Sequence, residues 1–172
     1  MSEDLINLSG RKFHAKRNHI SKFKNCYPDY RFEEITNSNK EDAYKVMLDW
    51  CAENEIDIEH YEEKNAIREA LDNMEEFKMH GGIVYVKDKA VAMTLGCEIS
   101  PIAFDICFEK ALREYDGIYA VINNEFAKTL SSYKYINREE DMGIEGLKKS
   151  KLSYNPIILI ARYNATLKND GN

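Results

Sequence analysis

The sequence contains no long hydrophobic run and no leader-like beginning. Its most apolar run, Ile157–Ala161, falls far short of the roughly 20 residues that a helix needs to span a bilayer. Residues 1–12 (MSEDLINLSGRK) lack the apolar core of a signal peptide. We therefore expect a cytoplasmic protein without a transmembrane segment.

Cysteine and histidine are scarce, and their spacing indicates neither a metal site nor a disulfide framework. His14 and His19 are five residues apart, whereas two ligands on one helical face are three or four apart. Signatures of P-loops, dinucleotide sites, zinc sites and Ser-His-Asp triads are also missing. We expect no bound metal, and buried or incidental thiols in a reducing compartment at Cys26, Cys51, Cys97 and Cys107.

The chain has fewer basic than acidic residues, which gives a net charge of −6, and the charged residues are unevenly distributed along the sequence. Residues 1–24 carry six Lys or Arg against two Asp or Glu, whereas residues 25–80 carry six against sixteen. Residues 81–172 carry twelve of each. An acidic protein with one basic arm is not a general nucleic-acid binder, although the arm can still contact a phosphate chain.

Apolar periodicity divides the chain into helices and strands. The pattern predicts a basic helix at Ser9–Lys24, a strand at Tyr30–Thr36, a helix opened by a capping box of Ser38 and Glu41, and a helix at Tyr61–Met79 ended by Gly81 and Gly82. It then predicts strands at Ile83–Val86, Ala90–Leu95 and Ala103–Phe108, a helix at Gly117–Ser131, a strand ending near Ile136, a short helix at Leu147–Leu152 and a strand at Ile157–Tyr163.

This order predicts an α/β (α+β) fold in which one mixed central sheet is flanked by helices, because that arrangement buries every apolar face. Two helices follow the first strand, and a hairpin and a strand–helix–strand unit come next. This succession resembles the GNAT acyltransferase fold. A likeness of fold does not by itself establish chemistry.

The stretch with the most reactive side chains is Tyr133–Pro156, YKYINREEDMGIEGLKKSKLSYNP. The end of a strand is followed by a cluster of consecutive polar residues, Asn137–Asp141. Gly143 and Gly146 then allow tight turns, and a short basic helix follows. Carboxylates and ammonium groups in a strand-to-helix turn favour acid–base work or anion binding. The alternative is a solvated turn with surface ion pairs that contribute little.

Most GNAT enzymes hold the pyrophosphate of coenzyme A on backbone N–H groups between the central strand and the long helix. That site needs a Gln/Arg-x-x-Gly-x-Gly/Ala loop, because backbone must approach phosphate closely. The corresponding turn here, Glu109–Gly117, has one glycine and carries Glu114 and Asp116, which repel pyrophosphate. We expect coenzyme A to bind poorly, and no other cofactor is indicated.

Four segments resemble a narrower family, the bacterial proteins grouped with the phosphatidylglycerol lysyltransferase C-terminal domain. They are KFHAKRNHISKFK, FEKA, GIYAVINNEFA and YINREEDMGIEGLKKSKLSYNP, which span most of the chain. The run from Gly146 to Lys151, followed by Tyr154 and Pro156, is similar to that family's Gly-Leu-Arg-Arg-x-Lys, aromatic, Pro pattern. Lys148 replaces an arginine there, which removes a bidentate phosphate fork but keeps the charge.

The resemblance implies a particular domain organisation. Members of this family usually carry two tandem GNAT-like domains, and they are related to Fem-type transferases that take amino acids from aminoacyl-tRNA. This chain matches the second domain. Residues 1–28 are then a basic helical junction to a missing N-terminal domain, residues 29–164 are the GNAT-like domain, and residues 165–172 are a disordered tail.

The resulting hypothesis is transfer of an aminoacyl group from a tRNA ester to an amine or hydroxyl. The ester is already activated, so the protein need only position the reactants, remove a proton and stabilise charge. Asp141 or Glu139 would be the base, and Lys151 would stabilise the oxyanion or the leaving ribose oxygen. Glu109 would orient the donor's amino group. Further contacts are expected from the substrate-binding residues Asn137, Arg138, Lys148, Lys149 and Tyr154 and from the RNA-binding residues Lys16 and Arg17.

Other interpretations stay open. Asn137 could instead satisfy local backbone. The domain could be a non-catalytic binding or assembly domain, or an acetyl-CoA-dependent N-acetyltransferase with an atypical phosphate loop. Expected partners are aminoacyl-tRNA, a small-molecule, peptide or lipid acceptor, and the N-terminal domain. Without that domain we expect an exposed apolar patch and a symmetric dimer, through Leu5, Ile6, Leu8 and Phe13.

Overall fold

The structure, a computed structural model, describes residues 1–161, 163, 165 and 166. Its middle layer is a five-stranded sheet with the order β1-β2-β3-β4-β5. Neighbouring strands are antiparallel except β4 and β5, which run parallel. The strands are β1 (Arg31–Glu34), β2 (Met79–Val86), β3 (Lys89–Ser100), β4 (Ala103–Ala111) and β5 (Tyr135–Asn137).

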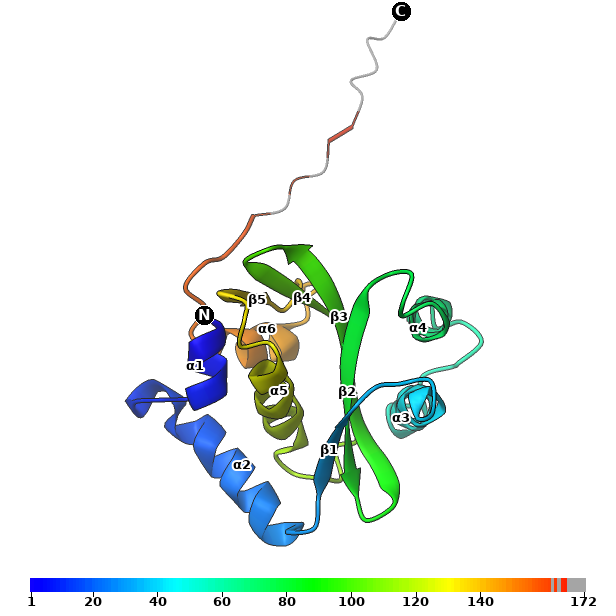
Figure 1. Cartoon of the computed structure of the whole chain (residues 1–172), viewed down its shortest axis with the longest axis horizontal. Coiled ribbons are helices and arrows are strands. Elements are labelled where there is room, and N and C mark those ends of the chain that lie inside the picture. Colours follow the sequence, from blue (N-terminus) through cyan, green and yellow to red (C-terminus); the bar gives the residue numbers. More distant parts are fainter. Residues whose placement is uncertain (162, 164, 167–172) are drawn as a thin grey trace, which may run out of the picture.

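Helices cover both faces of this sheet, with α3 and α4 on one face and α1, α2 and α5 on the other (Figure 1). The predicted α/β fold with a mixed, helix-flanked sheet is confirmed. No helix in the described part of the chain is long and apolar enough to cross a membrane. The helices are α1 (Ser2–Asn7), the 3-10 turn η1 (Arg11–Phe13), α2 (His14–Cys26), α3 (Lys40–Glu53), α4 (Glu63–Asp72), α5 (Ile118–Thr129) and α6 (Glu145–Leu152).

Each face of the sheet has its own apolar core. Along β2, Ile83 packs with the residues of α3 and α4, whereas its neighbour Val84 packs with those of α2 and α5. Successive side chains of a strand point to opposite faces, so a strand covered on both faces has no polar positions. This explains why Ile83–Val86 is an unbroken apolar run.

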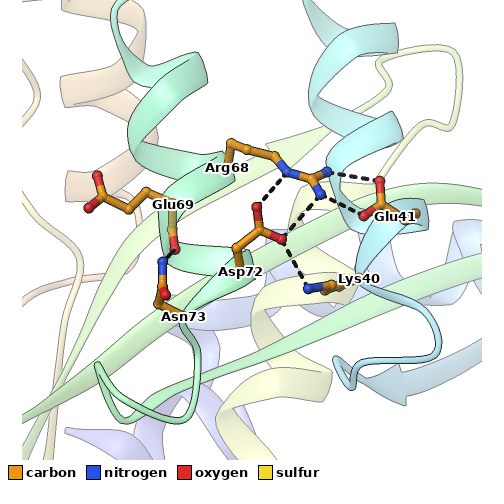
Figure 2. Close-up of polar contacts among 6 residues, drawn as sticks. All are labelled: Lys40, Glu41, Arg68, Glu69, Asp72 and Asn73. Carbon is orange, nitrogen blue, oxygen red and sulfur yellow. Dashed lines mark hydrogen bonds and ion pairs between the residues drawn. The ribbon is translucent and has the colours of Figure 1, made fainter.

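Arg68 of α4 ties this helix to α3 through a surface ion network (Figure 2). Its Nη1 and Nη2 atoms contact the two carboxylate oxygens of Glu41, each at 2.8 Å. Its Nε lies 2.8 Å from Asp72 Oδ2, and Lys40 Nζ lies 3.0 Å from Asp72 Oδ1. Exposed pairs add little stability, but this bidentate geometry fixes how α3 and α4 lie together.

The helix predicted at Tyr61–Met79 is shorter in the structure than expected, and the predicted C-cap at Gly81 and Gly82 is wrong. The helix α4 ends at Asp72, and Met79 already belongs to β2. Gly82 lies inside that strand, where an added Cβ would be 2.3 Å from a ring carbon of Phe32. Glycine is needed there for close packing rather than for capping a helix.

Two predicted helix starts are also wrong. The helix α3 begins after Asn39 without a side-chain cap bond, so Ser38 and Glu41 form no capping box. Glu41 binds Arg68 instead. The basic helix α2 starts at His14 rather than Ser9, because the chain turns first at Gly10, which has a φ of 83°.

The strand predicted at Ile157–Tyr163 is absent from residues 157–161 and 163. No described strand pairs with this segment, and its side chains are open to solvent, with Leu159 and Ile160 75% and 79% exposed. Residue 162 lies outside the described residues, as do residues 167–172 of the predicted disordered tail.

The predicted apolar patch at the N-terminus is wrong, because these side chains are covered by their own chain. Leu5, Leu8 and Phe13 are buried in the same core as α5, and Ile6 packs against it. Asn124 of α5 donates its Nδ2 hydrogens to the carbonyls of Leu5 at 2.7 Å and Ile6 at 2.8 Å. The argument for a dimer through this segment therefore fails. The exposed large apolar side chains near the C-terminal end are Met142, Ile144, Leu147, Leu152, Ile157, Ile158, Leu159, Ile160 and Tyr163.

Candidate functional site

The candidate site lies where β4 and β5 separate. The two strands pair only between Ala103–Asp105 and Tyr135–Asn137. Beyond this point β4 continues to Ala111 with no described strand on that side, while the chain after β5 turns away at Glu139, which has a φ of 51°. An opening between two parallel strands gives side chains access from both faces of the sheet.

A bulge in β4 decides which side chains reach each face of the opening. Leu95 of β3 pairs with Phe108, but the next residue pairs with Ile106, so Cys107 is an extra residue in β4. Ile106 packs in the core beside α5, whereas Phe108, only two positions later, packs on the α3 side. Glu109 consequently faces the α5 side.

Glu109 and Arg138 form an ion pair across the opening. Glu109 Oε1 lies 2.7 Å from Arg138 Nη2, and the two side chains are only 12% and 18% exposed. Among the described residues, Arg138 Nε and Nη1 and Glu109 Oε2 are buried and have no hydrogen-bond partner. Burying such groups without partners is costly, so the pair retains a strong capacity to bind a polar ligand.

Tyr154 forms the floor beneath this pair and carries a second cation. The Arg138 guanidinium lies 4.6 Å from the centre of its ring, and Lys16 Nζ lies 3.9 Å from the same centre. Burial raises the pKa of Tyr154 to about 12, and burial together with the charge of Arg138 lowers the pKa of Lys16 to about 8. Lys16 of α2, predicted to bind RNA, is thus part of the same cluster as Glu109.

The helix α6 contributes one lysine to the site and leaves two outside. Lys151 Nζ donates to the carbonyls of Arg138 at 2.5 Å and Glu140 at 2.6 Å. Burial and the charge of Arg138 lower its pKa. Lys148 and Lys149 are exposed on the surface. Of the predicted catalytic groups, Lys151 therefore lies beside the Glu109–Arg138 pair.

A carboxyl pair occupies the other face of the opening. Asp105 lies between Phe104 and Ile106, which both pack beside α5, so its side chain points to the opposite face. Asn137 Nδ2 lies 2.6 Å from Asp105 Oδ1. Burial and the neighbouring Glu139 carboxylate raise the pKa of Asp105 to about 6. The structure thus joins the predicted residues Glu139 and Asn137 to an unpredicted acid.

Asp141 and Arg17 have structural partners. Asp141 Oδ1 accepts the backbone N–H of Gly143 at 3.0 Å in the turn before α6. Arg17 Nη1 donates to the carbonyls of Leu8 at 2.5 Å and Gly10 at 2.7 Å, which ties α2 to the segment before it. Arg17 therefore stands apart from the cluster around Arg138, whereas Asp141 is held in the turn but lies close enough for its charge to act on Lys151.

The turn between β4 and α5, where most GNAT enzymes hold pyrophosphate, is occupied by a carboxylate of the protein. Glu53, the last residue of α3, accepts the backbone N–H of Arg113 at 2.9 Å and of Glu114 at 3.3 Å. On the other side, Gly117 lies against α2, where an added Cβ would be 2.5 Å from the His19 carbonyl oxygen. Two N–H groups of this turn that could bind an anion are therefore already bonded to the protein itself.

Sequence reasoning missed Asp105, Glu53 and the position of Lys16 beside Tyr154. An acid inside the apolar strand segment AFDICF was a signal for Asp105, because such a residue needs a polar partner. Nothing local marked Glu53 or Lys16, since their partners lie far along the chain. Among the described residues, no group of three or more His, Cys, Asp or Glu side chains could hold a metal ion.

Comparisons with known proteins give a family and a fold. A family model for the C-terminal part of phosphatidylglycerol lysyltransferase matches residues 1–166. An uncharacterized protein of Mycoplasmoides gallisepticum is 24% identical over 164 residues, which are 94% of this chain and 53% of that protein. The crystal structure of a conserved protein of unknown function from Bacteroides thetaiotaomicron has a TM-score of 0.87 and 44% identity, over 92% of this chain and 55% of that chain.

A smaller solved structure matches over nearly its whole length. The structure of a possible acetyltransferase from Clostridium difficile has a TM-score of 0.60 and 16% identity, over 83% of this chain and 99% of that chain. This likeness confirms the predicted GNAT-like fold. By contrast, the chain spans about half the length of the two relatives from Mycoplasmoides and Bacteroides.

Proposed function

Because the chain belongs to the family of the phosphatidylglycerol lysyltransferase C-terminal domain, we propose that it moves an aminoacyl group from aminoacyl-tRNA to an amine or hydroxyl acceptor. The acceptor group can belong to a small molecule, a peptide or a lipid. Charged tRNA is made in the cytoplasm, which is accordingly the proposed compartment. The whole protein, with the domain that the family implies, is the proposed active form.

One observation carries this proposal: among the described residues, the buried Glu109–Arg138 pair has a carboxylate oxygen that accepts no hydrogen bond and guanidinium nitrogens that donate none. Glu109 Oε2 can accept from the ammonium group of an aminoacyl ester, while Arg138 Nε and Nη1 can donate to its carbonyl oxygen. A charged donor and a charged acceptor side by side match the two ends of this group. Charge-assisted hydrogen bonds of this kind are the strong ones.

The carboxyl pair on the opposite face supplies the base. An acceptor that enters from that face loses its proton to Glu139, which is hydrogen-bonded to Asp105, and Asp105 is in turn held by Asn137. We favour Glu139 over Asp141, because Asp141 is bonded in the turn before α6. A base on one face and the ester on the other leave room for the acceptor between them.

The bond changes are those of ester aminolysis or transesterification. The acceptor nitrogen or oxygen bonds to the ester carbonyl carbon, Glu139 takes the acceptor proton, and the bond from that carbon to the ribose oxygen breaks. Lys151 donates two hydrogens to backbone carbonyls, so its third is left for the leaving ribose oxygen. Lys148 and Lys149, exposed on α6, would contact outer phosphates of the donor.

The same turn that most GNAT enzymes use for coenzyme A argues against an acetyl-CoA reaction. An incoming pyrophosphate would have to displace the Glu53 carboxylate from the N–H groups of Arg113 and Glu114. Glu114 and Asp116 are themselves paired, with Lys89 at 2.8 Å and Lys22 at 2.6 Å, so the Glu53 carboxylate is the main obstacle. An activated ester of RNA needs no such turn, and we therefore favour it as donor.

The test is a label-transfer assay with the full-length protein. Radiolabelled aminoacyl-tRNAs are incubated with amine and hydroxyl acceptors, and the label is followed from tRNA into product. Acetyl-CoA serves as the competing donor, and Glu109→Gln as the site variant. We expect transfer from at least one charged tRNA and a loss of about 100-fold in Glu109→Gln, because a charge-assisted bond to the donor is lost.

Two results would contradict the proposal. Transfer from acetyl-CoA but from no charged tRNA would make the domain an N-acetyltransferase. Binding of a charged tRNA analogue without transfer to any acceptor, in the full-length protein, would make it a binding domain.

A further inference from the structure

Most basic residues in and just before α2 have polar partners within the protein itself. Three form ion pairs: Lys12 with Asp4 at 3.1 Å, Lys22 with Asp116 at 2.6 Å and Lys24 with Glu125 at 3.2 Å. Arg17 donates to backbone carbonyls. Within the described part of the chain, only Arg11 and Lys16 of this group lack such partners, and Arg11 is fully on the surface.

Lys16 is the basic residue of α2 that points into the candidate site. Its ammonium lies over the Tyr154 ring, on which the Arg138 guanidinium also rests. The one carboxylate shared by these two cations is Glu109, which is already paired with Arg138. This half-buried cluster has more positive than negative charge, and the burial that lowers the pKa of Lys16 leaves its ammonium poorly solvated.

We propose that Lys16, Arg138 and Tyr154 form a recessed site for a single phosphodiester anion, and that its occupant is the phosphate nearest the 3′ end of an RNA strand. The proposal rests on the proposed function, in which an aminoacyl ester at an RNA 3′ end meets Glu109 and Arg138. An anion beside Lys16 would supply the missing negative charge and restore the solvation that its ammonium has lost. The Tyr154 hydroxyl offers a further donor.

The arrangement favours an inserted RNA end over a lipid surface. Binding to an anionic membrane needs several exposed, unpaired basic residues close together. Here Lys12 of η1 and Lys22 and Lys24 of α2 are held by Asp4, Asp116 and Glu125, and the available lysine is recessed against Tyr154. A recessed position for a single charge suits the end of a flexible strand, which can enter where a bilayer surface cannot.

The experiment measures binding of a short 5′-labelled single-stranded RNA by fluorescence anisotropy at several salt concentrations. We expect Lys16→Met to weaken binding about tenfold, as for loss of one charge-assisted contact. The slope of log affinity against log salt should fall by about 0.7, the value for one phosphate of a single strand. Lys16→Arg should retain binding. Lys12→Met, which removes a charge already paired with Asp4, should leave affinity and slope unchanged.

Two further probes test the occupant. A circular RNA of the same sequence has no 3′ end and should bind to the wild type no better than to Lys16→Met. Vesicles containing phosphatidylglycerol should not distinguish the two proteins. Equal RNA affinity and slope in wild type and Lys16→Met, with both proteins melting alike, would overturn the proposal, and so would a loss confined to vesicles. If label transfer fails while these titrations behave as expected, the transfer reaction is wrong and this site stands.

Discussion

Glu109 and Arg138 are joined across the opening between β4 and β5 by a 2.7 Å contact, although 28 residues separate them in sequence. The pair connects the central strand to the chain that follows β5, so it shapes the opening as well as lining it. Its energetics can be tested without knowledge of any substrate.

We expect Arg138→Met to destabilise the fold by about 3 kcal/mol, because it leaves the Glu109 carboxylate buried without its partner. Adding Glu109→Gln should recover part of this loss, so that the two changes are strongly non-additive. Urea unfolding of the two single variants and the double variant measures the coupling. The exposed pair Lys45 and Asp49 provides the control, where the same cycle should give a much smaller value. Additive effects at 109 and 138 would show that the buried contact is not formed in solution.

The Glu53 carboxylate should be structural, because it satisfies two N–H groups at the start of the β4–α5 turn. We expect Glu53→Ala to lower the free energy of unfolding by about 1–2 kcal/mol, since both donors lose a charged acceptor. Acetyl-CoA should not raise the melting temperature of the wild type, because it would have to displace this carboxylate. Micromolar binding of acetyl-CoA to the wild type, measured by titration calorimetry, would contradict this account of the turn.

Two glycines should respond oppositely to the same change. Gly117 has a φ of 88° and its added Cβ would lie 2.5 Å from the His19 carbonyl oxygen, so Gly117→Ala should cost at least about 2 kcal/mol. Gly146 lies within α6, with nothing near an added Cβ, so Gly146→Ala should stabilise the protein by up to about 1 kcal/mol. Thermal and urea unfolding of the two variants give the comparison. A neutral Gly117→Ala would mean that α2 does not pack closely on this turn.

The carboxyl pair should make stability depend on pH in an unusual direction. The pKa of Asp105 is raised to about 6 in the folded protein, against about 3.9 for an unfolded aspartate, so the folded state binds the extra proton between these values. The contribution of Asp105 to stability therefore falls as pH rises from about 4 to about 6, and the loss is complete above that window. The expected loss is about 3 kcal/mol, because the pKa differs by about two units between the folded and unfolded states.

Asp105→Asn isolates this effect from the other acids of the chain. The variant keeps an oxygen for Asn137 but cannot ionise. Relative to wild type, it should gain stability as pH rises from about 4 to about 6 and then keep a constant advantage. Urea unfolding at half-unit pH steps measures the difference. A constant difference across the window would mean that Asp105 titrates normally.

Much of the sheet could be predicted, because burial on two faces leaves a strong local signal. The sequence pattern of Ile83–Val86 predicts a strand without reference to its partners, and these residues form the second half of β2, an interior strand of the sheet. The error at Gly81 and Gly82 arose because glycine has two roles. The local sequence suggested the end of a helix. In the structure, the side chain of Phe32 occupies the space that a Cβ at Gly82 would need, and Phe32 lies on β1, far away in sequence but next to β2 in the sheet.

Segments whose partners are unknown could not be predicted in the same way. The segment Ile157–Tyr163 begins with five apolar residues, and this run predicted a strand. A strand requires a neighbour to bond its backbone, and the described residues do not provide one. Conversely, Leu5 and Leu8 looked uncovered, because their cover, α5, lies more than a hundred residues further along. Sequence pattern reports that a face is apolar but not what covers it.

The candidate site was predictable in its residue types and less so in its geometry. Glu109 and Arg138 were singled out from strand-end and turn positions, and the structure brings them together. Asp105 was missed because a single acid in an apolar strand does not indicate which distant residues it contacts. The distribution of these groups over two faces was beyond sequence reasoning altogether, since it depends on the bulge at Cys107.

That bulge decides which face each acid of β4 occupies. In a regular strand of this sequence, Asp105 and Glu109 would lie four positions apart on the same face, whereas the extra residue Cys107 places them on opposite faces. Because Ile106 and Phe108 already face opposite sides of the sheet, loss of Cys107 would restore regular alternation without turning over any later residue. Glu109 would keep its place beside Arg138. In related chains, loss of this one residue is therefore compatible with the same chemistry, whereas one residue inserted between Phe108 and Glu109 would move the acid to the α3 face.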